Sequence, residues 1–192
     1  MKLEPSQISK LVSFFRIVCN LKRIKRAGWL HKSKIKVPES VADHSYSMCM
    51  ISMVLSDIMN TNTEHIMKMV NLHDLAESLV GDNMPDEISG KEKAILEDKA
   101  MNKIVSRLPK SLQEKYLHIW NEYNENNTAS AKFVHSIDKL EMAIQAKEYE
   151  FEGYSKQSLK IFMKSATDYI SNNGYDSLLE ILQTINDDSS KI

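Results

Sequence analysis

Apolar residues recur at helical spacing along most of this chain. Four stripes begin at Ile8, Met48, Ile66 and Phe133, and each continues at intervals of three or four residues. That spacing places side chains on one face of an α-helix, and the alternating Val-rich runs typical of strands are absent. The pattern predicts an all-α fold with helices over residues 5–22, 39–60, 63–79, 90–107, 111–124, 128–152, 157–172 and 175–186.

Residues that interrupt helices separate these segments. They are Gly28, Pro38, the stretch from Gly81 to Pro85, Pro109, Asn126–Asn127, Gly153 and Gly174. The 192 residues include only five Gly and four Pro, and 42% of them are hydrophobic. This composition argues against disorder, and the length is most simply that of one domain with a sizeable core.

The overall charge, the lengths of the apolar runs and the cysteines indicate which partners and which location to expect. A net charge of −1 gives no general attraction to nucleic acid or to a membrane surface. No apolar run reaches the roughly 20 residues that a membrane span requires, so we expect no membrane partner. Cys19 and Cys49 lack CxxC spacing, which favours reduced thiols and a cytoplasmic location.

Two histidines and two aspartates in three of the predicted helices form the most informative pattern. They are His44, the doublet His73-Asp74, and Asp138. A single inward histidine is usually a satisfied core residue, and a buried carboxylate is costly unless it is paired or bound to a metal. Because all four side chains are predicted to tilt inward, we expect a divalent-metal site. Its mixed nitrogen and oxygen ligands suit Mn, Fe, Co, Ni or Zn better than Ca.

Two further acids follow the His-Asp doublet. Glu77 lies four residues after His73, which predicts that both share one helical face. It could take a proton from an activated water, although it could also be an ordinary surface acid. Asp82 follows Gly81 in a predicted turn. It could orient water, bind a substrate sugar or help Glu77 hold a second ion, or it could be only a turn residue.

A basic segment, LKRIKRAGWLHKSKIK, precedes the helix that carries His44. It contains seven Lys and Arg residues, no acid, and one aromatic residue, Trp29. Such a run is often just a solvated face. Next to a metal, however, it could clamp a phosphate and pack against a sugar or base. Extended nucleic-acid binding is disfavoured, because the rest of the chain is not basic.

The order H…HD…D, given by His44, His73-Asp74 and Asp138, resembles the HD-domain superfamily of metal-dependent phosphohydrolases. The strings LKRIKRAGWL, VPESVADHS, HDLAESLVGD, AKFVHSIDKLEM and QAKEYE are similar to the HD-domain 5′-deoxynucleotidases, both bacterial and, more closely, eukaryotic. The similarity covers about residues 11–152. It implies an HD-domain bundle of about seven to eight helices, as one domain over residues 1–192, with that core and C-terminal helices at 157–186.

The resemblance also implies an activity and an assembly. The expected reaction is hydrolysis of deoxyribonucleoside 5′-monophosphates to deoxynucleoside and phosphate by a homodimer. The implied cofactor is a divalent metal ion, with Mn, Co, Fe, Ni, Zn and Mg all left open by the sequence. His44, His73, Asp74 and Asp138 match the metal ligands of the family.

The remaining matches concern the substrate and a second ion. Glu77 matches the catalytic carboxylate, and Asp82 matches the acid associated with substrate or a second metal. Asn83 follows, and its main-chain carbonyl could reach that second metal. Arg26 resembles the phosphate-binding arginine, and Trp29 resembles the tryptophan that crowds the sugar 2′ position. The bacterial pattern has these two residues adjacent, whereas here Ala27-Gly28 intervenes.

Two other functions compete with this interpretation. One is a different HD phosphohydrolase that acts on a cyclic nucleotide, a nucleoside triphosphate or an alarmone. The absence of long insertions favours a small monophosphate. The other is a non-catalytic, metal-stabilised scaffold that binds nucleotides or partners. Glu77 and Asp82 argue against a scaffold, since a purely structural metal site needs no extra acids beside open coordination positions.

Overall fold

The computed structural model describes residues 3–84 and 88–188, and within these ranges it confirms the all-α prediction. Its helices are α1 (Pro5–Asn20), α2 (Ala27–Ser33), α3 (Val41–Ile58), α4 (Thr63–Leu72), α5 (Glu77–Val80), α6 (Gly90–Val105), α7 (Lys110–Glu125), α8 (Ala129–Phe151), α9 (Lys156–Asn172) and α10 (Asp176–Asp187). A short 3-10 helix, η1 (Leu21–Arg23), follows α1. These ten α-helical segments exceed the expected seven or eight, because α2 and α5 are short, separate helices.

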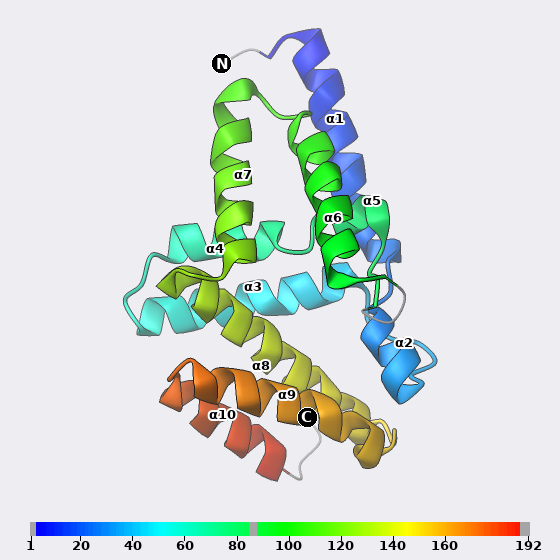
Figure 1. Ribbon diagram of the computed structural model, residues 1–192, viewed down its shortest axis with the longest axis vertical. Helices are drawn as coiled ribbons and strands as arrows, with labels where there is room; N and C mark the ends of the chain where they lie inside the picture. Colours follow the sequence, from blue (N-terminus) through cyan, green and yellow to red (C-terminus); the bar gives the residue numbers. More distant parts are fainter. Residues whose placement is uncertain (1–2, 85–87, 189–192) are drawn as a thin grey trace.

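Helix α8 is the centre of the structure and packs on α3, α4, α7, α9 and α10 (Figure 1). Every third or fourth residue along it is fully buried, including Val134, Ile137 and Leu140. These side chains belong to the main hydrophobic core, which α3, α4 and α6 also line. A second cluster of buried residues lies around Trp29 and joins α2 to the ends of α8 and α9. The main core therefore follows α8 from Ala131 to Ala143, and the second cluster continues it at Ala146 and Tyr149.

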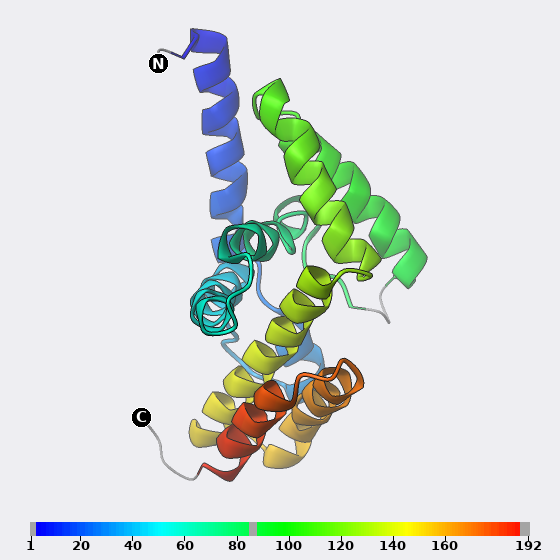
Figure 2. The ribbon, with the colours of Figure 1, turned by 90° about the vertical axis from the view of Figure 1, so that its left-hand side faces the viewer.

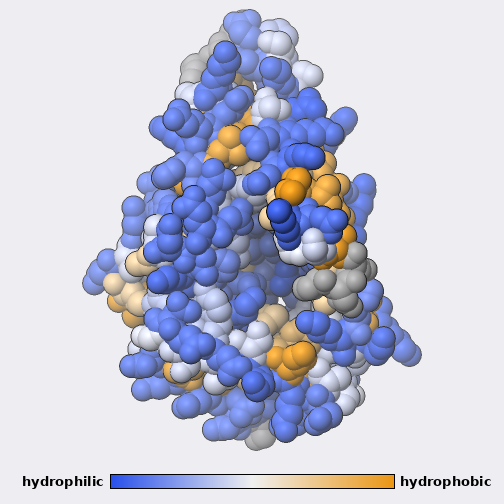
Figure 3. Space-filling view, viewed as in Figure 1, coloured by the Kyte–Doolittle hydropathy of each residue, from blue (hydrophilic) through white to orange (hydrophobic). Residues whose placement is uncertain are grey.

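The ends of the molecule extend away from this centre. Helices α1, α6 and α7 project from one side of α3 and α4, and α9 and α10 cover the opposite side of α8 (Figures 1 and 2). On the face shown in Figure 3, a hollow lined mainly by hydrophilic residues lies between α6 and α8. None of the described helices has the length and apolarity needed to cross a membrane.

The start of α3 is fixed by a capping box that also sets the position of His44. The Ser40 hydroxyl accepts a hydrogen bond from the Asp43 N–H, and the Asp43 carboxylate accepts one from the Ser40 N–H at 2.8 Å. Such caps stabilise a helix by about 1 kcal/mol. His44 therefore lies in the first turn of α3, where its side chain points into the core.

The predicted interruption at Gly28 is wrong, because residues 27–33 form α2. Asp82 makes this helix start where it does: its Oδ2 accepts a hydrogen bond from the Ala27 N–H at 2.8 Å. That contact comes from 55 residues away, so no local pattern predicts it. Helix α2 ends at Lys34, whose φ of 57° is left-handed. Pro85, one of the other predicted interruptions, lies outside the described residues.

The predicted helix over 63–79 is also wrong, since α4 ends at Leu72 and residues 73–76 form a turn. The His73 Nδ1 donates to the Val70 carbonyl at 2.6 Å. This carbonyl is the acceptor that an uninterrupted helix would offer to the Asp74 N–H. The backbone instead forms hydrogen bonds over three residues, as when the Glu77 N–H donates to the Asp74 carbonyl. His73 and Glu77 therefore do not share one continuous helical face, as the sequence predicted.

Candidate metal centre

His44 brings an imidazole from α3 to the middle of the molecule. The ring is fully buried, and its Nδ1 lies 2.5 Å from Glu141 Oε2 on α8. Its Nε2 points toward two other carboxylates, 3.3 Å from Asp138 Oδ1 and 3.9 Å from Asp74 Oδ2. Burial lowers the pKa of His44, but Asp138 and Glu141 outweigh it and raise that pKa to about 9. The surroundings therefore stabilise positive charge at this ring.

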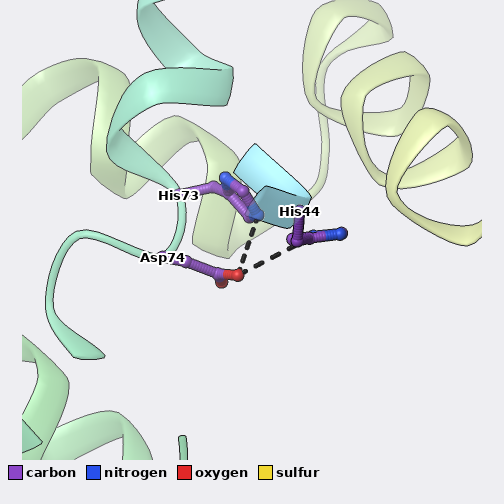
Figure 4. Close-up of side chains that lie close together, drawn as sticks. All are labelled: His44, His73 and Asp74. Atoms are coloured by element: carbon purple, nitrogen blue, oxygen red, sulfur yellow. Dashed lines mark ion pairs between the residues drawn. The ribbon is translucent and has the colours of Figure 1, made fainter. Parts of the chain in front are cut away.

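His73 presents its second ring nitrogen to the same place. Because Nδ1 donates to the Val70 carbonyl, Nε2 is the ring nitrogen that is left to face the centre. It lies 3.1 Å from Asp74 Oδ2. Figure 4 shows both rings and the Asp74 carboxylate turned toward one another from α3 and from the turn after α4. Two imidazoles and one carboxylate thus converge from separate elements.

Asp74 and Asp138 carry the negative charge of this centre. Arg26 Nη1 lies 3.1 Å from Asp74 Oδ2, and its Nη2 lies 3.8 Å from Asp138 Oδ1. Lys139 Nζ donates to the other oxygen of Asp138 at 2.7 Å. Burial raises the pKa of Asp74, but the neighbouring His73 and Arg26 outweigh it and hold the carboxyl well below its usual range. Asp138 is likewise held ionised, by Lys139 and His44 against the effect of burial on its pKa.

These donors fit a divalent metal. The ligand atoms of His44, His73 and Asp74 all lie within 4.8 Å of one another. Two ligands on a metal at about 2.1 Å are separated by roughly 3.0–4.2 Å, which matches the distances above. Among the described residues, the buried Nε2 atoms of His44 and His73 have no hydrogen-bond partner. Buried polar atoms without partners are costly, and a metal would satisfy both. Asp138 lies beside this trio as a fourth donor.

Glu77 lies at the start of α5 and is also buried. Its Oε2 has no hydrogen-bond partner among the described residues, and its Oε1 lies 3.9 Å from Lys93 Nζ on α6. Burial, together with Asp74 and Asp82, raises the pKa of Glu77 well above its ordinary value. A carboxyl group of this kind is a stronger base than a solvated glutamate, although the predicted helical spacing from His73 is not what positions it.

The expected second-ion residues have other contacts in this structure. Asp82 caps α2 through the Ala27 N–H, and the Asn83 carbonyl accepts from Lys93 Nζ at 3.2 Å. Lys93 Nζ also lies 3.6 Å from Glu97. The Lys93 ammonium therefore occupies the space between Glu77 and Asn83. Neither Lys93 nor Glu97 was among the predicted site residues. Their spacing of four residues predicts a pair on one helix, but it does not predict that Lys93 reaches Asn83.

Arg26 and Trp29 have different environments although only two residues separate them. Arg26 reaches into the centre, whereas Trp29 is 2% exposed and packs against Phe162, with ring centroids 4.2 Å apart. The Trp29 Nε1 donates to Glu39 Oε1 at 2.8 Å. This burial in the second core gives the ring a supporting role in the structure and weakens the expectation that it contacts a sugar directly.

Glu141 is the functional candidate that sequence reasoning missed. It is 2% exposed and is the partner of His44 Nδ1. A signal was present, because Glu141 lies three residues after Asp138 on α8, and residues at that spacing share a helical face. Glu39 was missed as well. It precedes α3 in an irregular segment, where no periodicity indicates the direction of a side chain.

Comparisons with known proteins agree with this geometry. The HD domain family model matches residues 18–178. The 5′-deoxynucleotidase HDDC2 of Danio rerio is 36% identical over 186 residues, which cover 96% of this chain and 90% of the relative. The 5′-deoxynucleotidase HDDC2 of Homo sapiens is 40% identical over 141 residues, covering 73% and 68% of the two chains.

A solved structure gives the same result for the fold. A conserved hypothetical protein from Pyrococcus furiosus superimposes with a TM-score of 0.73 and 30% sequence identity, over 91% of this chain and 98% of the other. The family match, the relatives and this superposition each span most of the described residues, including the turn that carries His73 and Asp74. The chain therefore belongs to the HD domain family.

Proposed function

We propose that this protein is a metal-dependent phosphomonoesterase that hydrolyses deoxyribonucleoside 5′-monophosphates to deoxynucleoside and phosphate. One observation carries the proposal: two buried imidazole nitrogens without partners face the Asp74 carboxylate in a chain that matches 5′-deoxynucleotidases over most of its length. The proposed ligands are His44, His73, Asp74 and Asp138, with Mn, Co, Fe, Ni, Zn or Mg as the ion. A divalent metal held there would supply Lewis-acid activation of a water and of a phosphoryl oxygen.

Arg26 is the proposed phosphate-binding residue. Its guanidinium already lies beside Asp74 and Asp138, within reach of anything bound at the centre. Burial lowers the pKa of Arg26, but the two carboxylates outweigh it, so the side chain is always charged. With Asp74 and Asp138 holding a metal, the Arg26 guanidinium would be free to donate paired hydrogen bonds to phosphate oxygens.

Glu77 is the proposed proton acceptor. Its raised pKa makes it basic enough to take a proton from an attacking water, and its buried position excludes competing solvent. Asp82 is proposed to act with it at the substrate. Support for Asp82 comes from its bond to the Ala27 N–H, which fixes the start of α2 next to Arg26. This contact lets Asp82 position the phosphate-binding residue as well as face the substrate.

A second ion, held by Glu77, Asp82 and the Asn83 carbonyl, remains part of the proposal, but it has a competitor. Lys93 Nζ contacts the Asn83 carbonyl and lies near Glu77, so an ion at that place would have to displace the ammonium. A like charge at the same position weakens cation binding. We therefore expect the first ion to bind much more tightly than the second.

A homodimer is the proposed assembly, and α1 supports it. All of its residues are described, and none is fully buried, while Ile8, Val12, Phe15 and Val18 are exposed along it. A cavity of about 650 Å³, lined mainly by apolar side chains from α1, α3 and α4, includes Phe14 and Val18 of this helix. Exposed apolar side chains gathered along one helix are typical of an interface.

Light scattering tests the dimer. Phe15→Glu should convert the dimer to a monomer, whereas Ile161→Glu, at a similarly exposed position on α9, should leave it intact. Equal masses for the two variants would contradict an α1 interface. A cytoplasmic location is proposed as well, supported by the free thiols of Cys19 and Cys49.

A nucleotide panel tests the activity itself. We expect phosphate release from deoxyribonucleoside 5′-monophosphates, with a lower kcat/KM for the matched ribonucleotides. Arg26→Ala should lower kcat/KM for every monophosphate by a similar factor, because the phosphate is common to all of them. Hydrolysis of cyclic nucleotides or triphosphates in preference to monophosphates would replace this function with that of another phosphohydrolase. No hydrolysis of any nucleotide would indicate a scaffold.

A further inference from the structure

A second layer of carboxylates lies behind His44, on the side away from Asp74. Glu141 Oε2 is 2.5 Å from His44 Nδ1, and both side chains are almost completely buried. A carboxylate oxygen of Glu39 lies within 4.8 Å of these two atoms. Two acids thus lie near the Nδ1 edge of the ring, which points away from the metal position. A pair of buried acids is costly, so their placement needs a compensating partner.

Both acids are held in fixed positions. Glu39 Oε1 accepts from Trp29 Nε1 at 2.8 Å, and the Glu39 N–H donates to the Tyr149 hydroxyl oxygen at 2.8 Å. The Trp29 and Tyr149 rings pack edge to face, with centroids 5.2 Å apart. Glu141 projects from α8, one turn after Asp138. The second core therefore holds Glu39 in place, and α8 places Glu141 behind the ring.

A neutral imidazole has two tautomers, and only one of them can ligate through Nε2. When a carboxylate accepts the proton of Nδ1, Nε2 keeps a free lone pair and becomes more basic. At His44, Nε2 faces Asp74 and Asp138 and has no hydrogen-bond partner among the described residues, so a metal that replaces its proton would meet this nitrogen while Nδ1 stays bonded to Glu141. Without the acid behind it, the ring could rotate or change tautomer and turn a proton toward the metal position.

We propose that Glu141 is a positioning residue that fixes the tautomer and orientation of His44 for metal binding, and that Glu39, tied to Trp29, supports it. This inference rests on the proposed metal role of His44. It assigns Trp29 a function through Glu39, whose carboxylate lies within 4.8 Å of the facing atoms of His44 and Glu141.

Zinc affinity tests the inference without any measurement of activity. Zn²⁺ is titrated into metal-free protein in competition with a chromophoric chelator. Glu141→Gln and Glu141→Ala should weaken binding by roughly 10- to 100-fold, the range found when such outer partners are removed. Glu39→Gln should weaken it less. Glu148→Gln, on the same helix and half-buried, is the matched control and should bind as the parent does.

The ¹⁵N NMR signals of the His44 ring give an independent signature. In the zinc-loaded parent, Nδ1 should be protonated and Nε2 should bind the metal, with the assignment made from a His44→Gln spectrum. This parental measurement decides the matter even if a Glu141 variant does not fold. An unprotonated Nδ1, or unchanged zinc affinity in Glu141→Gln, would overturn this inference and leave the proposed function standing. A parent that binds no zinc, manganese or cobalt would overturn the proposed function with it.

Discussion

The metal centre and the segment around α2 were both singled out in the sequence by their charged and aromatic residues. They differ in the directions that these side chains take in the structure. In the centre, donors from α3, the turn after α4, and α8 all face one point. In the α2 segment, neighbouring residues separate: Arg26 turns into the centre and Trp29 turns into the second core. The predicted donors therefore lie together in one region, whereas in the other two neighbouring residues of the predicted site point to different places.

This difference has a physical cause. The donors of the centre lie on or beside long helices, whose periodicity fixes the inward direction of each side chain. The α2 segment is short and is held by remote partners, namely Asp82 at its start and Phe162 against its indole ring. Direction there depends on tertiary contacts, which adjacent sequence does not encode.

The largest effects are expected at the metal ligands. His73→Ala or Asp74→Asn should lose bound metal and nearly all activity, and should lose the stability that metal gives to the folded state. Elemental analysis and phosphate release measure both effects. His118→Ala, at an exposed position on α7, is the control. Parental metal content in both ligand variants would remove these residues from the site.

Glu77 should affect turnover more than binding. Glu77→Gln preserves the shape of the side chain but removes its ability to accept a proton, so kcat should fall by about 10²-fold or more. The first equivalent of metal should stay bound as in the parent, because Glu77 lies outside the trio of ligand atoms. Steady-state kinetics beside elemental analysis separate these effects. Full turnover in this variant would exclude Glu77 as the base and leave Asp82 as the candidate.

Trp29 should affect stability more than substrate choice. Replacing a buried tryptophan by alanine costs about 3–5 kcal/mol. Trp29→Phe keeps an aromatic ring but loses the bond to Glu39, which costs roughly 1–3 kcal/mol. Urea unfolding measures both, with Leu30→Ala on the half-exposed side of α2 as the control. Increased ribonucleotide hydrolysis by Trp29→Ala with parental stability would instead support direct crowding of the sugar.

Lys93 should control the second ion. Lys93→Met removes the ammonium between Glu77 and Asn83 and leaves Glu77 and Glu97 without their cation. Manganese titration by calorimetry should then show tighter binding of a second equivalent, while the first equivalent is unaffected. Lys91→Met, two residues away and exposed, is the control. A second equivalent that binds equally in parent and Lys93→Met would show that the ammonium does not compete.

The smallest effect concerns pH. Burial and Glu141 raise the pKa of Glu39 from 4.5 to about 7. Between these values the folded protein holds a proton on Glu39 that the unfolded chain releases, so the contribution of Glu39 to stability is fully present below about pH 4.5 and is lost as pH rises through 7. Glu39→Gln should flatten this slope in metal-free protein, whereas exposed Glu152→Gln should not. Urea midpoints across the range measure it, and an unchanged slope would contradict the raised pKa.

The sequence located the long helices more accurately than it located the residues at which some of them end. Helix α8 was expected over 128–152 and spans Ala129–Phe151, because its apolar positions repeat without a break. The end of α4 was missed, since a side-chain bond from His73 to the Val70 carbonyl ends it within an apolar repeat. Helix α2 was missed because its first N–H is bonded by an acid 55 residues away.

The same contrast holds for the site. His44, His73 and Asp74 were predicted and lie together, because each is fixed by its place on or next to a regular helix. Lys93 and Glu39 were not predicted, since their contacts with Asn83 and Trp29 join separate elements ten residues apart, a spacing that helical periodicity does not cover. Local periodicity gives the direction of a side chain, but the partner that it meets depends on the packing of whole helices.

Reversible loss of activity on metal removal tests the central claim most directly. Phosphate release from deoxyadenosine monophosphate is measured on protein stripped with a chelator, and again after Mn²⁺ or Co²⁺ is restored. We predict no hydrolysis by the stripped protein and recovery in proportion to the first equivalent of metal bound, with no recovery in His73→Ala. Hydrolysis that persists in the stripped protein, or that never appears with any metal, would contradict a metal-dependent phosphomonoesterase built on His44, His73 and Asp74.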